Sequence, residues 1–455
     1  MHDPIYTFVE LPPHIAAIVD TPEFQRLRQI KQLSTVFYRY PGAHHTRFEH
    51  CIGTFHIAST FLDFLKFQIE ERFATAFKEI RAPEIGFKTR AEVETAALLH
   101  DIGHGPFGHT MDFLLSRIGF DPLKRHEYFG IKKVSSQESN IRDKLISQDL
   151  DVQNICNLIE GKPPIRVDDR ELSPDEMLYY SFLGQIVDSP ISSDRIDYLI
   201  RDAYYSGVRM VSLDLTGILA ALRLHAYYPH PGEPAVQIDL AFDIEAMWAL
   251  EAALLSHTAM YKTVYHNRTH RVLQEMVVRA FESYIQKKYG SIEKISEDDV
   301  YDIMNLADHE AIGYLQEYEE SREIIRRVME RRPYETALEI PWNRMPEPLK
   351  RYSERLGGAR QRVRDLETLF VKQCGHLSAG ELIIDIPVVR YPSMVIPLVQ
   401  KRENGSFVST SLLAESDIVK ALAKIPFIDK IIVAVSKSDA IPAVRAVARD
   451  IFHLE

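Results

Sequence analysis

Residues 98–109 read Leu-Leu-His-Asp-Ile-Gly-His-Gly-Pro-Phe-Gly-His, which places three histidines, one aspartate and three glycines in one short stretch. Residues 91–99 are good helix formers with apolar side chains at helical spacing, so we expect a helix there. The helix should end at the glycines, and Pro106 cannot continue it. His100 and Asp101 therefore lie together at a buried helix end, where each is costly to bury without a partner.

One bound metal ion would satisfy both members of this pair. The alternative is an ordinary helix C-terminus followed by a few loop histidines, which is the common situation for a single histidine. The additional histidines at 104 and 109 favour the metal site. Histidine nitrogens together with aspartate oxygens suit Fe, Mn, Zn or Ni, and Mg is also compatible. We therefore expect one divalent metal ion per active site.

The composition of the whole chain narrows the class of protein. A chain of 455 residues is too long for one ordinary core, and a hydrophobic content of 45% is typical of a soluble globular protein. It has no apolar run long enough for a membrane span and no signal-peptide pattern, so we expect a cytoplasmic protein without a membrane partner. Three widely separated cysteines argue against a disulfide framework, and a net charge of −11 argues against nucleic acid as the main partner.

Two further segments carry candidate site residues. A long helix is expected to extend to about residue 80, and it contains His50 close to Arg47. Periodicity alone does not decide which of the histidines between residues 44 and 56 is functional. Residues 191–203 place an apolar stripe on one face and a polar stripe on another. The polar stripe suits either a solvated helix face or a cleft with a carboxylate for metal, a ring for stacking and guanidinium groups for phosphate; its members are Asp194, Arg195, Tyr198, Arg201 and Asp202.

The remaining pattern predicts a mainly α-helical body. Residues 20–33 open with a helix-start signal, and residues 244–285 and 295–375 read as helical. After about residue 376 the pattern changes to short apolar runs that read as strands, flanked by helical stretches. These runs predict a small C-terminal α/β appendage; they lie at 381–387, 394–399 and 430–435.

Several of these stretches together resemble one known family. Residues 47–50 (Arg-Phe-Glu-His), residues 100–109 and residues 194–198 (Asp-Arg-Ile-Asp-Tyr) resemble the H…HD…D signature of the HD-domain phosphohydrolases. Residues 20–28 (Asp-Thr-Pro-Glu-Phe-Gln-Arg-Leu-Arg) are similar to the deoxynucleoside triphosphate triphosphohydrolase branch of that family. The similarity covers roughly residues 2–285. It implies an HD-domain helical core over residues 1–285, a helical extension over 286–375 and a small α/β subdomain over 376–455.

The resemblance also implies roles for individual residues. The expected metal ligands are His50, His100, Asp101 and Asp194. The expected catalytic or phosphate-binding residues are His104, His109 and His126, with His109 donating a proton to the leaving ribose oxygen. Spacing alone would place His126 in a surface cluster. The expected substrate contacts are Gln32, Arg47, Arg195, Tyr198 and Asp202.

The implied reaction is hydrolysis of a deoxynucleoside triphosphate (dNTP) to a deoxynucleoside and inorganic triphosphate. The resemblance further implies a homo-oligomer, with a tetramer favoured, and a dNTP or GTP effector near Asp20, Gln25 and Arg28. His257 and Tyr261 depart from the family pattern, which bears on substrate contacts on that side of the site. Two alternatives are an HD phosphohydrolase that acts on another nucleotide and a nucleotide-sensing binding module with a degenerate site.

Overall fold

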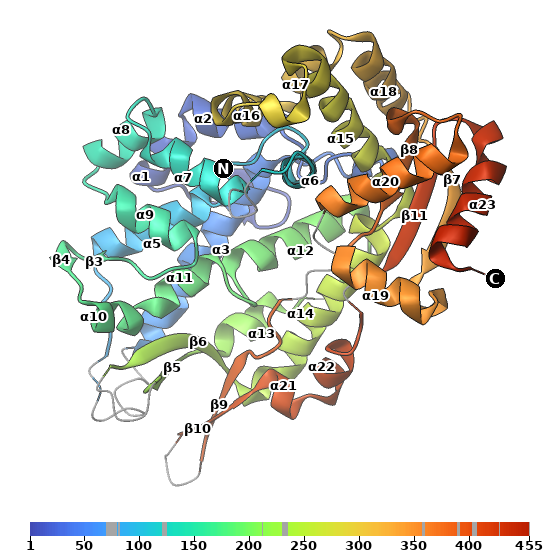
Figure 1. Cartoon of the computed structure of the whole chain (residues 1–455). Helices are drawn as coiled ribbons and strands as arrows, with labels where there is room; N and C mark the ends of the chain where they lie inside the picture. The colour runs from blue at the N-terminus through green and yellow to red at the C-terminus, as the bar shows by residue number, and fades with distance from the viewer. Residues whose placement is uncertain are drawn as a thin grey trace.

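The computed structural model describes residues 1–69, 80, 82–120, 125–211, 213–229, 235–356, 360–388, 392–402, 407–426 and 428–454. The protein is mainly α-helical, as the sequence predicts (Figure 1). The helices up to residue 289 are α1 Pro13–Val19, α2 Pro22–Gln25, α3 Arg47–Gln68, α5 Phe87–Leu99, α6 His109–Arg117, α7 His126–Ser135, α8 Asn140–Ser147, α9 Val152–Ile159, α10 Pro174–Tyr179, α11 Ser181–Val187, α12 Ser193–Ser206, α13 Leu215–Ala220, α14 Met247–Met260 and α15 Arg268–Tyr289.

The later helices are α16 Glu297–Met304, α17 Asp308–Leu315, α18 Glu319–Met329, α19 Glu347–Leu356, α20 Arg360–Cys374, α21 Leu412–Glu415, α22 Asp417–Leu422 and α23 Ile441–Phe452. The strands are β1 His2–Asp3, β2 Thr7–Phe8, β3 Arg166–Val167, β4 Arg170–Glu171, β5 Leu222–Tyr227, β6 Gln237–Asp243, β7 Glu335–Pro341, β8 Leu382–Asp385, β9 Pro397–Lys401, β10 Phe407–Ser411 and β11 Lys430–Val435.

Helix α3 is central to the N-terminal body because it packs against both α5 and α12. Every residue of α5 from Ala91 to Leu99 is buried, so this helix is covered on all sides. It ends directly before His100, as expected from the glycines that follow. The largest hydrophobic cluster fills the space around these helices and α9 and α11. The start of α3, the end of α5 and the start of α12 are thereby fixed relative to one another.

The helix expected over residues 20–33 is shorter in the structure. Helix α2 is followed by a 3-10 turn over residues 26–29, and Ile30 is extended. Lys31 pairs with Thr46 in an isolated β-bridge, which requires the chain to leave the helix before this point. The expected extension of α3 over residues 70–79 lies outside the described residues.

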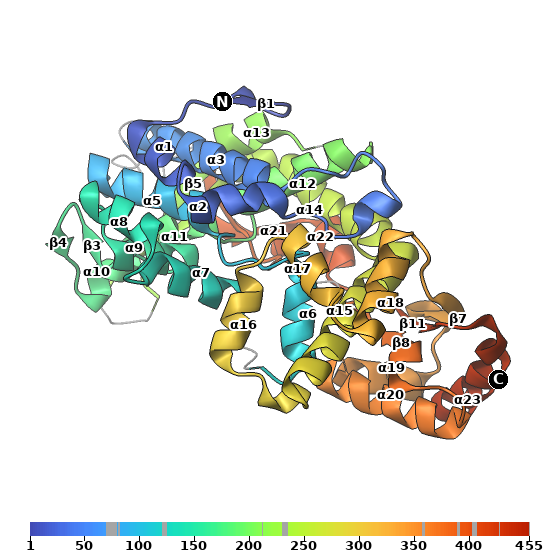
Figure 2. The ribbon, with the colours of Figure 1, turned by 90° about the horizontal axis from the view of Figure 1, so that it is seen from above.

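Strands from the two sides of the boundary expected near residue 376 pair with one another. Strands β8 and β11 form an antiparallel sheet with β7, which comes from within the segment expected to be helical. Helices α20 and α23 pack on this sheet (Figure 2). Strands β9 and β10 instead join β6 and β5 of the N-terminal body, with β9 parallel to β6. Residues 376–455 thus supply strands to two sheets, each of which also contains strands from before residue 376.

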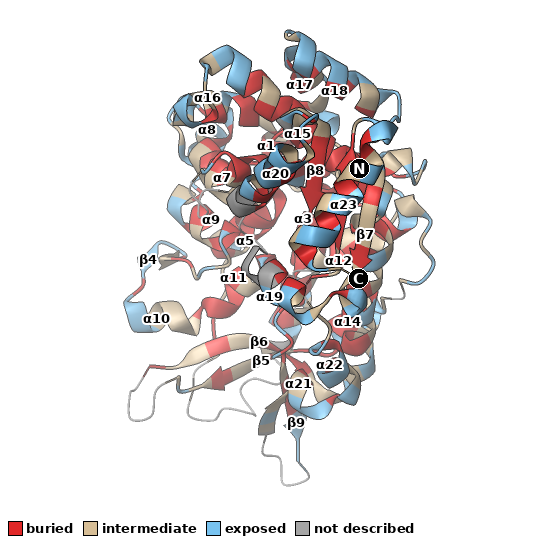
Figure 3. Cartoon of the chain, turned by 45° about the vertical axis from the view of Figure 1, so that its right-hand side comes forward, coloured by how far each residue is buried: buried red, intermediate tan, exposed pale blue. Residues whose placement is uncertain are grey.

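Helix α15 connects the helical body to the sheet of β7, β8 and β11, since it contacts α6, α17, α18 and β8. Most of its length is buried, whereas the outer faces of α17 and α18 are exposed (Figure 3). Among the residues described above, we find no helix long and apolar enough to cross a membrane.

Candidate active site

The ends of α3, α5 and α12 meet at a cluster of three side chains. His50 lies in the first turn of α3, His100 directly follows α5, and Asp194 lies in the first turn of α12. The Nε2 atom of His50 is 3.2 Å from Nε2 of His100 and 3.1 Å from Oδ1 of Asp194. The Nε2 atom of His100 is 3.4 Å from the same carboxylate oxygen. Three donor atoms therefore converge on one point from three helices.

Asp101 adds a second carboxylate to this cluster. Its Oδ1 is 3.5 Å from Nε2 of His100, and its Oδ2 is 3.6 Å from Nε2 of His50. Arg47 forms an ion pair with the same Asp101 side chain. Ligands of an ion bound at about 2.0–2.2 Å are separated by roughly 3.0–3.6 Å, so this donor set fits a divalent metal ion. The structure thus brings together all four residues that the sequence predicts as ligands.

Hydrogen bonds on the far side of each imidazole orient its free nitrogen toward the cluster. The Nδ1 atom of His50 is 2.8 Å from Oδ2 of Asp197, and Nδ1 of His100 is 2.9 Å from the carbonyl oxygen of Ala97. Both partners are acceptors, so each Nδ1 keeps its hydrogen and each Nε2 is the nitrogen that can give up its proton to a metal ion. This is the tautomer that a metal ion requires of both ligands.

Asp197 is itself held by a buried polar network that reaches the N-terminal hairpin. It accepts hydrogen bonds from the hydroxyl of Tyr6 at 2.7 Å and from Nε of Arg201 at 2.9 Å. Arg201 also donates to Asp3 at 2.8 Å. Asp197 lies three residues after Asp194 in the Asp-Arg-Ile-Asp-Tyr motif, but the sequence by itself does not predict this role.

The charges in the cluster favour an ionised, metal-binding set. Burial opposes the charged form of His50, but its hydrogen bonds to Asp194 and Asp197 raise its pKa to about 10. Burial also disfavours the carboxylates, yet Arg47 and His100 hold the pKa of Asp101 well below its usual range. The same two histidines lower the pKa of Asp194. Both carboxylates are ionised at neutral pH, and a metal ion would displace the protons on the imidazoles.

A second cluster contains the three remaining histidines of the predicted site. The ring of His104 stacks on that of His126 with centroids 3.8 Å apart, and His109 contacts His104 edge-on at 4.6 Å. Asp112 lies between two of them: its Oδ2 is 2.9 Å from Nδ1 of His109 and 3.2 Å from Nδ1 of His126. Asp112 was missed by the sequence analysis, although it lies one helical turn after His109 on α6.

These histidines differ in charge. Burial opposes protonation of His126, but Asp112 and Glu127 outweigh it and raise the pKa of His126 to about 9. Burial, together with the nearby charges of Arg47 and His126, holds the pKa of His104 well below its usual range. The neutral His104 places its Nε2 3.2 Å from Oδ1 of Asp101, so Asp101 lies between the two clusters.

Arg47 offers further donors at the same place. Its side chain is buried, and within the described residues its Nε and Nη2 atoms have no hydrogen-bond partner. A Cβ atom on Gly108 would lie 2.6 Å from Nη2, so the glycine leaves room for the guanidinium. Buried donors without a protein acceptor are costly, and an anionic oxygen would satisfy them.

Of the predicted sugar-binding residues, Asp202 is already engaged with other side chains. Asp202 accepts a hydrogen bond from the hydroxyl of Tyr265 at 2.6 Å and lies 2.8 Å from Nε2 of His45. The sequence does not predict this role for His45 or Tyr265. The backbone N–H of Gln32 donates to the carbonyl of His45 at 3.0 Å, which brings Gln32 to the same place. Burial raises the pKa of Tyr198, so its phenol is neutral.

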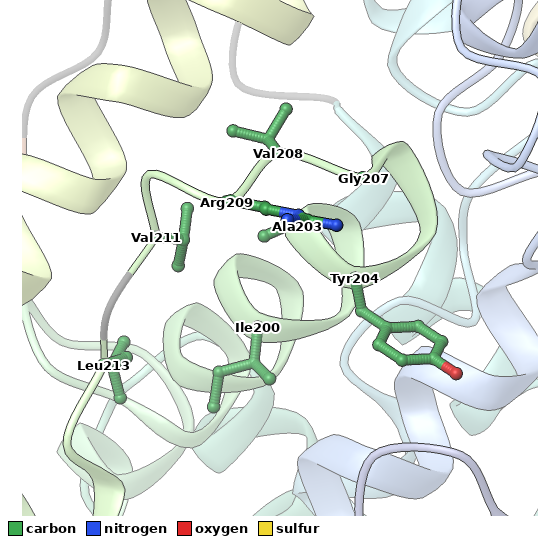
Figure 4. Close-up of a pocket in the computed structure, with 8 residues that line it drawn as sticks. All are labelled: Ile200, Ala203, Tyr204, Gly207, Val208, Arg209, Val211 and Leu213. Carbon is green, nitrogen blue, oxygen red and sulfur yellow. The ribbon is translucent and has the colours of Figure 1, made fainter.

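Two cavities lie along α12. A small one is lined by Arg195 and His257, among other residues, and therefore includes one predicted substrate contact. A larger one of about 410 Å³ lies at the C-terminal end of α12 and the loop after it (Figure 4). It contains none of the predicted site residues; it is lined by Ile200, Ala203, Tyr204, Gly207, Val208, Arg209, Val211 and Leu213.

Comparison with known protein families finds two models that match this chain. A family model described as "HD domain" matches residues 47–178, and one described as "HD associated region" matches residues 235–455. The chain is an HD-domain protein. The HD domain contains the whole second cluster and all the expected metal ligands except Asp194, which lies between the two matched regions.

Three relatives show which proteins this chain resembles, and two of them are named for an activity. The chain is 27% identical over 349 residues to a Dictyostelium discoideum protein named as a deoxynucleoside triphosphate triphosphohydrolase SAMHD1 homolog, covering 75% of this chain and 60% of that protein. It is 33% identical over 222 residues to the mouse deoxynucleoside triphosphate triphosphohydrolase SAMHD1, covering 46% and 32%. An uncharacterized protein of Methanocaldococcus jannaschii is 30% identical over 318 residues, covering 69% and 54%. The chain thus spans little more than half the length of the longer-matching relatives.

A solved structure shows the same fold over nearly the whole chain. The crystal structure of a hypothetical protein from Aquifex aeolicus matches with a TM-score of 0.69 and 23% identity, covering 98% of this chain and 99% of that one. The helices of the HD domain and the associated region therefore occur together in another protein.

The expected effector residues are not members of the metal-ligand cluster. Arg28 donates from Nε to Oε1 of Gln25 at 2.8 Å, and its guanidinium lies 3.4 Å from the ring centroid of Phe48. Asp20 is exposed. The effector, the tetramer and the domain boundaries stay predictions.

Proposed function

We propose that this HD-domain protein hydrolyses deoxynucleoside triphosphates to a deoxynucleoside and inorganic triphosphate, using a divalent metal ion. One observation carries the proposal: a metal-ligand cluster and a histidine cluster adjoin at Asp101, with unsatisfied donors of Arg47 beside them. The names of the Dictyostelium and mouse relatives support the choice of substrate.

The chemistry can be divided among named groups. The metal, when bound by His50, His100, Asp101 and Asp194, would polarise a phosphoryl oxygen and lower the pKa of a water molecule. The imidazolium of His126 and the guanidinium of Arg47 would bind the phosphate oxygens. These two cations would hold the triphosphate beside the metal ligands.

His109 would move the proton, and its surroundings support this role. Its Nδ1–H is held by Asp112, and its side chain is 61% exposed, so Nε2 is free to face a substrate. As water attacks the α-phosphorus and the bond from phosphorus to O5′ breaks, His109 would give the proton on Nε2 to O5′. The oxygen of the water remains on the triphosphate, and the proton that the water loses passes to the solvent. Asp112 would stabilise the protonated ring before the transfer.

On the sugar side, Tyr198 would form a neutral wall against the 2′ position and so favour deoxyribose. Gln32 and Asp202 would contact the sugar, and Arg195 a phosphate oxygen. Because His45 and Tyr265 already bind Asp202, these two side chains would set the position of its carboxylate.

The test is a substrate panel with identified products. Each of the four dNTPs, alone and in pairs, and each ribonucleotide is incubated with the protein and Mn²⁺ or Mg²⁺, and the products are separated by anion-exchange chromatography. We expect deoxynucleoside and tripolyphosphate in equal amounts from dNTPs, and none after chelation of the metal. Release of orthophosphate or pyrophosphate alone would exclude triphosphohydrolase activity.

Activity should decline in alkaline solution as His126 loses its proton. Its pKa is raised from 6.5 to about 9, so the cation that binds phosphate is present at neutral pH and is lost as the pH rises through about 9. The His126–Asp112 pair also stabilises the folded protein. This stabilisation is fully present below pH 6.5 and is lost as the pH rises through about 9. The measurement is kcat/KM from pH 6 to 10.

Two variants check this assignment. Asp112→Asn removes the charge that raises the pKa, so the alkaline limb should move to lower pH. His126→Gln should lack the limb altogether and show a higher KM. An unchanged alkaline limb in His126→Gln would assign it to another group.

A further inference from the structure

The loop over residues 102–108 carries His104 and leads directly into His109. Its backbone conformation is unusual near the end, since Phe107 has φ of +58° and Gly108 has φ of +56°. Glycine adopts this left-handed region freely, but phenylalanine does so only when the surroundings hold it there. The position of His109, two residues after Phe107, therefore depends on what holds Phe107.

Asp308 is the side chain that holds it. Asp308 is the first residue of α17, in the HD associated region. Its Oδ1 accepts the backbone N–H of Phe107 at 2.6 Å, and its Oδ2 accepts the backbone N–H of Lys31 at 3.0 Å. One carboxylate thus ties the histidine loop to the segment that precedes α3.

A cation ties the histidine loop to the segment that precedes α17. Nη2 of Arg26 donates to the carbonyls of Ile102 and His104 at 3.2 and 2.7 Å, and its Nη1 donates to those of Met304 and Leu306 at 3.4 and 2.9 Å. Arg26 therefore bridges the histidine loop and the segment before α17 with one guanidinium group.

The two segments also touch directly. A Cβ atom on Gly105 would lie 2.8 Å from the sulfur of Met304 and 3.2 Å from its Cα, so no larger residue fits without a shift. This contact, the carboxylate of Asp308 and the guanidinium of Arg26 all act on the loop and not on the metal-ligand side chains. His50 and His100 are oriented separately, by Asp197 and Ala97.

We propose that residues 304–308 form a clamp that positions the catalytic histidine loop, with Asp308 as its main positioning residue. The clamp sets where His104 and His109 stand relative to the bound phosphates, and so affects turnover while leaving metal binding unchanged. This inference rests on the proposed function of the histidines, and it gives the HD associated region a role in the active site.

The test is Asp308→Asn, which keeps the shape of the side chain. Its amide group can accept only one of the two backbone N–H groups and would present a donor to the other. We expect kcat to fall about 10- to 100-fold, because small displacements of catalytic groups have effects of this size. KM and bound metal should stay close to those of the unmodified protein, and Tm should fall slightly because one backbone N–H loses its acceptor.

Glu310→Gln is the matched control. Glu310 lies two residues further along α17 and accepts the backbone N–H of Ala307 at 2.7 Å; within the described residues no hydrogen bond joins it to residues 102–108. It should retain the kcat of the unmodified protein. An equal loss of kcat in both variants would assign the effect to α17 as a whole and overturn the clamp, as would an unchanged kcat or a loss of metal in Asp308→Asn.

A second readout needs no turnover. In protein labelled at the histidine ring carbons, Asp308→Asn should shift the NMR signals of His104 and His109 and leave those of His50 and His100 in place. Unshifted signals of His104 and His109 would overturn the clamp. Because this measurement uses no substrate, it separates a failure of the clamp from a failure of the proposed dNTP hydrolysis.

Discussion

Asp194→Ala is expected to remove the bound metal and lower kcat roughly 10³-fold or more, since metal ions supply several kcal/mol of transition-state stabilisation. Asp194 is the ligand that α12 contributes, and its Oδ1 lies 3.1 and 3.4 Å from the two imidazole nitrogens. Without it the remaining carboxylate is Asp101, which Arg47 already pairs with. The site would then lack the net negative charge that attracts a divalent cation.

The measurements are metal content by mass spectrometry after dialysis against Mn²⁺, and the initial rate of tripolyphosphate release. Asp188→Ala is the matched control, because Asp188 lies close to the site, 3.7 Å from Nη2 of Arg195, without belonging to the ligand cluster. It should keep its metal. A full metal complement in Asp194→Ala would show that the cluster of His50, His100 and Asp194 is not the metal site.

The local part of the site was accessible from sequence because its residues are neighbours in the chain. His100 and Asp101 end a helix whose apolar spacing is plain, and the structure ends α5 directly before them. His50 and Asp194 could be joined to that pair only through the family resemblance. The sequences of these two segments do not predict that α3 and α12 pack against one another. That contact is a property of the tertiary fold.

The residues that the sequence did not predict position other residues of the site. Asp197 and Asp112 orient histidines, and each lies one helical turn from a predicted site residue, so helical spacing could have found them. Asp308 and Tyr265 reach the site from distant helices and bind backbone or carboxylate groups there. No pattern around them in the sequence distinguishes them from other capping or surface residues.

Strand β7 illustrates the same limit for the fold. Its neighbours in sequence are charged helices, and its burial does not alternate regularly along the strand. The segment becomes a strand because β11 lies beside it and pairs with it over most of its length. Long-range pairing of this kind overrides local propensity.

Asp197→Asn is expected to weaken metal binding about 10- to 100-fold, as loss of a group that orients a metal ligand typically does. The carboxylate accepts hydrogen bonds from His50, Tyr6 and both Nε and Nη2 of Arg201. An asparagine of the same shape accepts on one side only. If its NH₂ group faces His50, the ring must take its hydrogen at Nε2, where it can no longer bind a metal ion.

The same variant should lower the free energy of unfolding by about 3 kcal/mol. This value is at the lower end of the cost of breaking a buried ion pair, because Asp3 still pairs with the charge of Arg201. Burial alone would raise the pKa of Asp197, but Arg201 and His50 hold it below its ordinary value. The stabilisation is therefore present at neutral pH and is lost only as the pH falls through that lowered pKa. Urea denaturation with and without Mn²⁺ measures both effects.

Tyr6→Phe separates the charge of Asp197 from its hydrogen bonds. It removes one neutral donor to Asp197 and leaves His50 and Arg201 paired, so we expect a loss of about 1 kcal/mol and nearly unchanged metal affinity. Equal metal affinities in Asp197→Asn and the unmodified protein would mean that the tautomer of His50 is set by the metal ion itself. In that case the buried network from Asp3 to Asp197 would serve only to stabilise the fold.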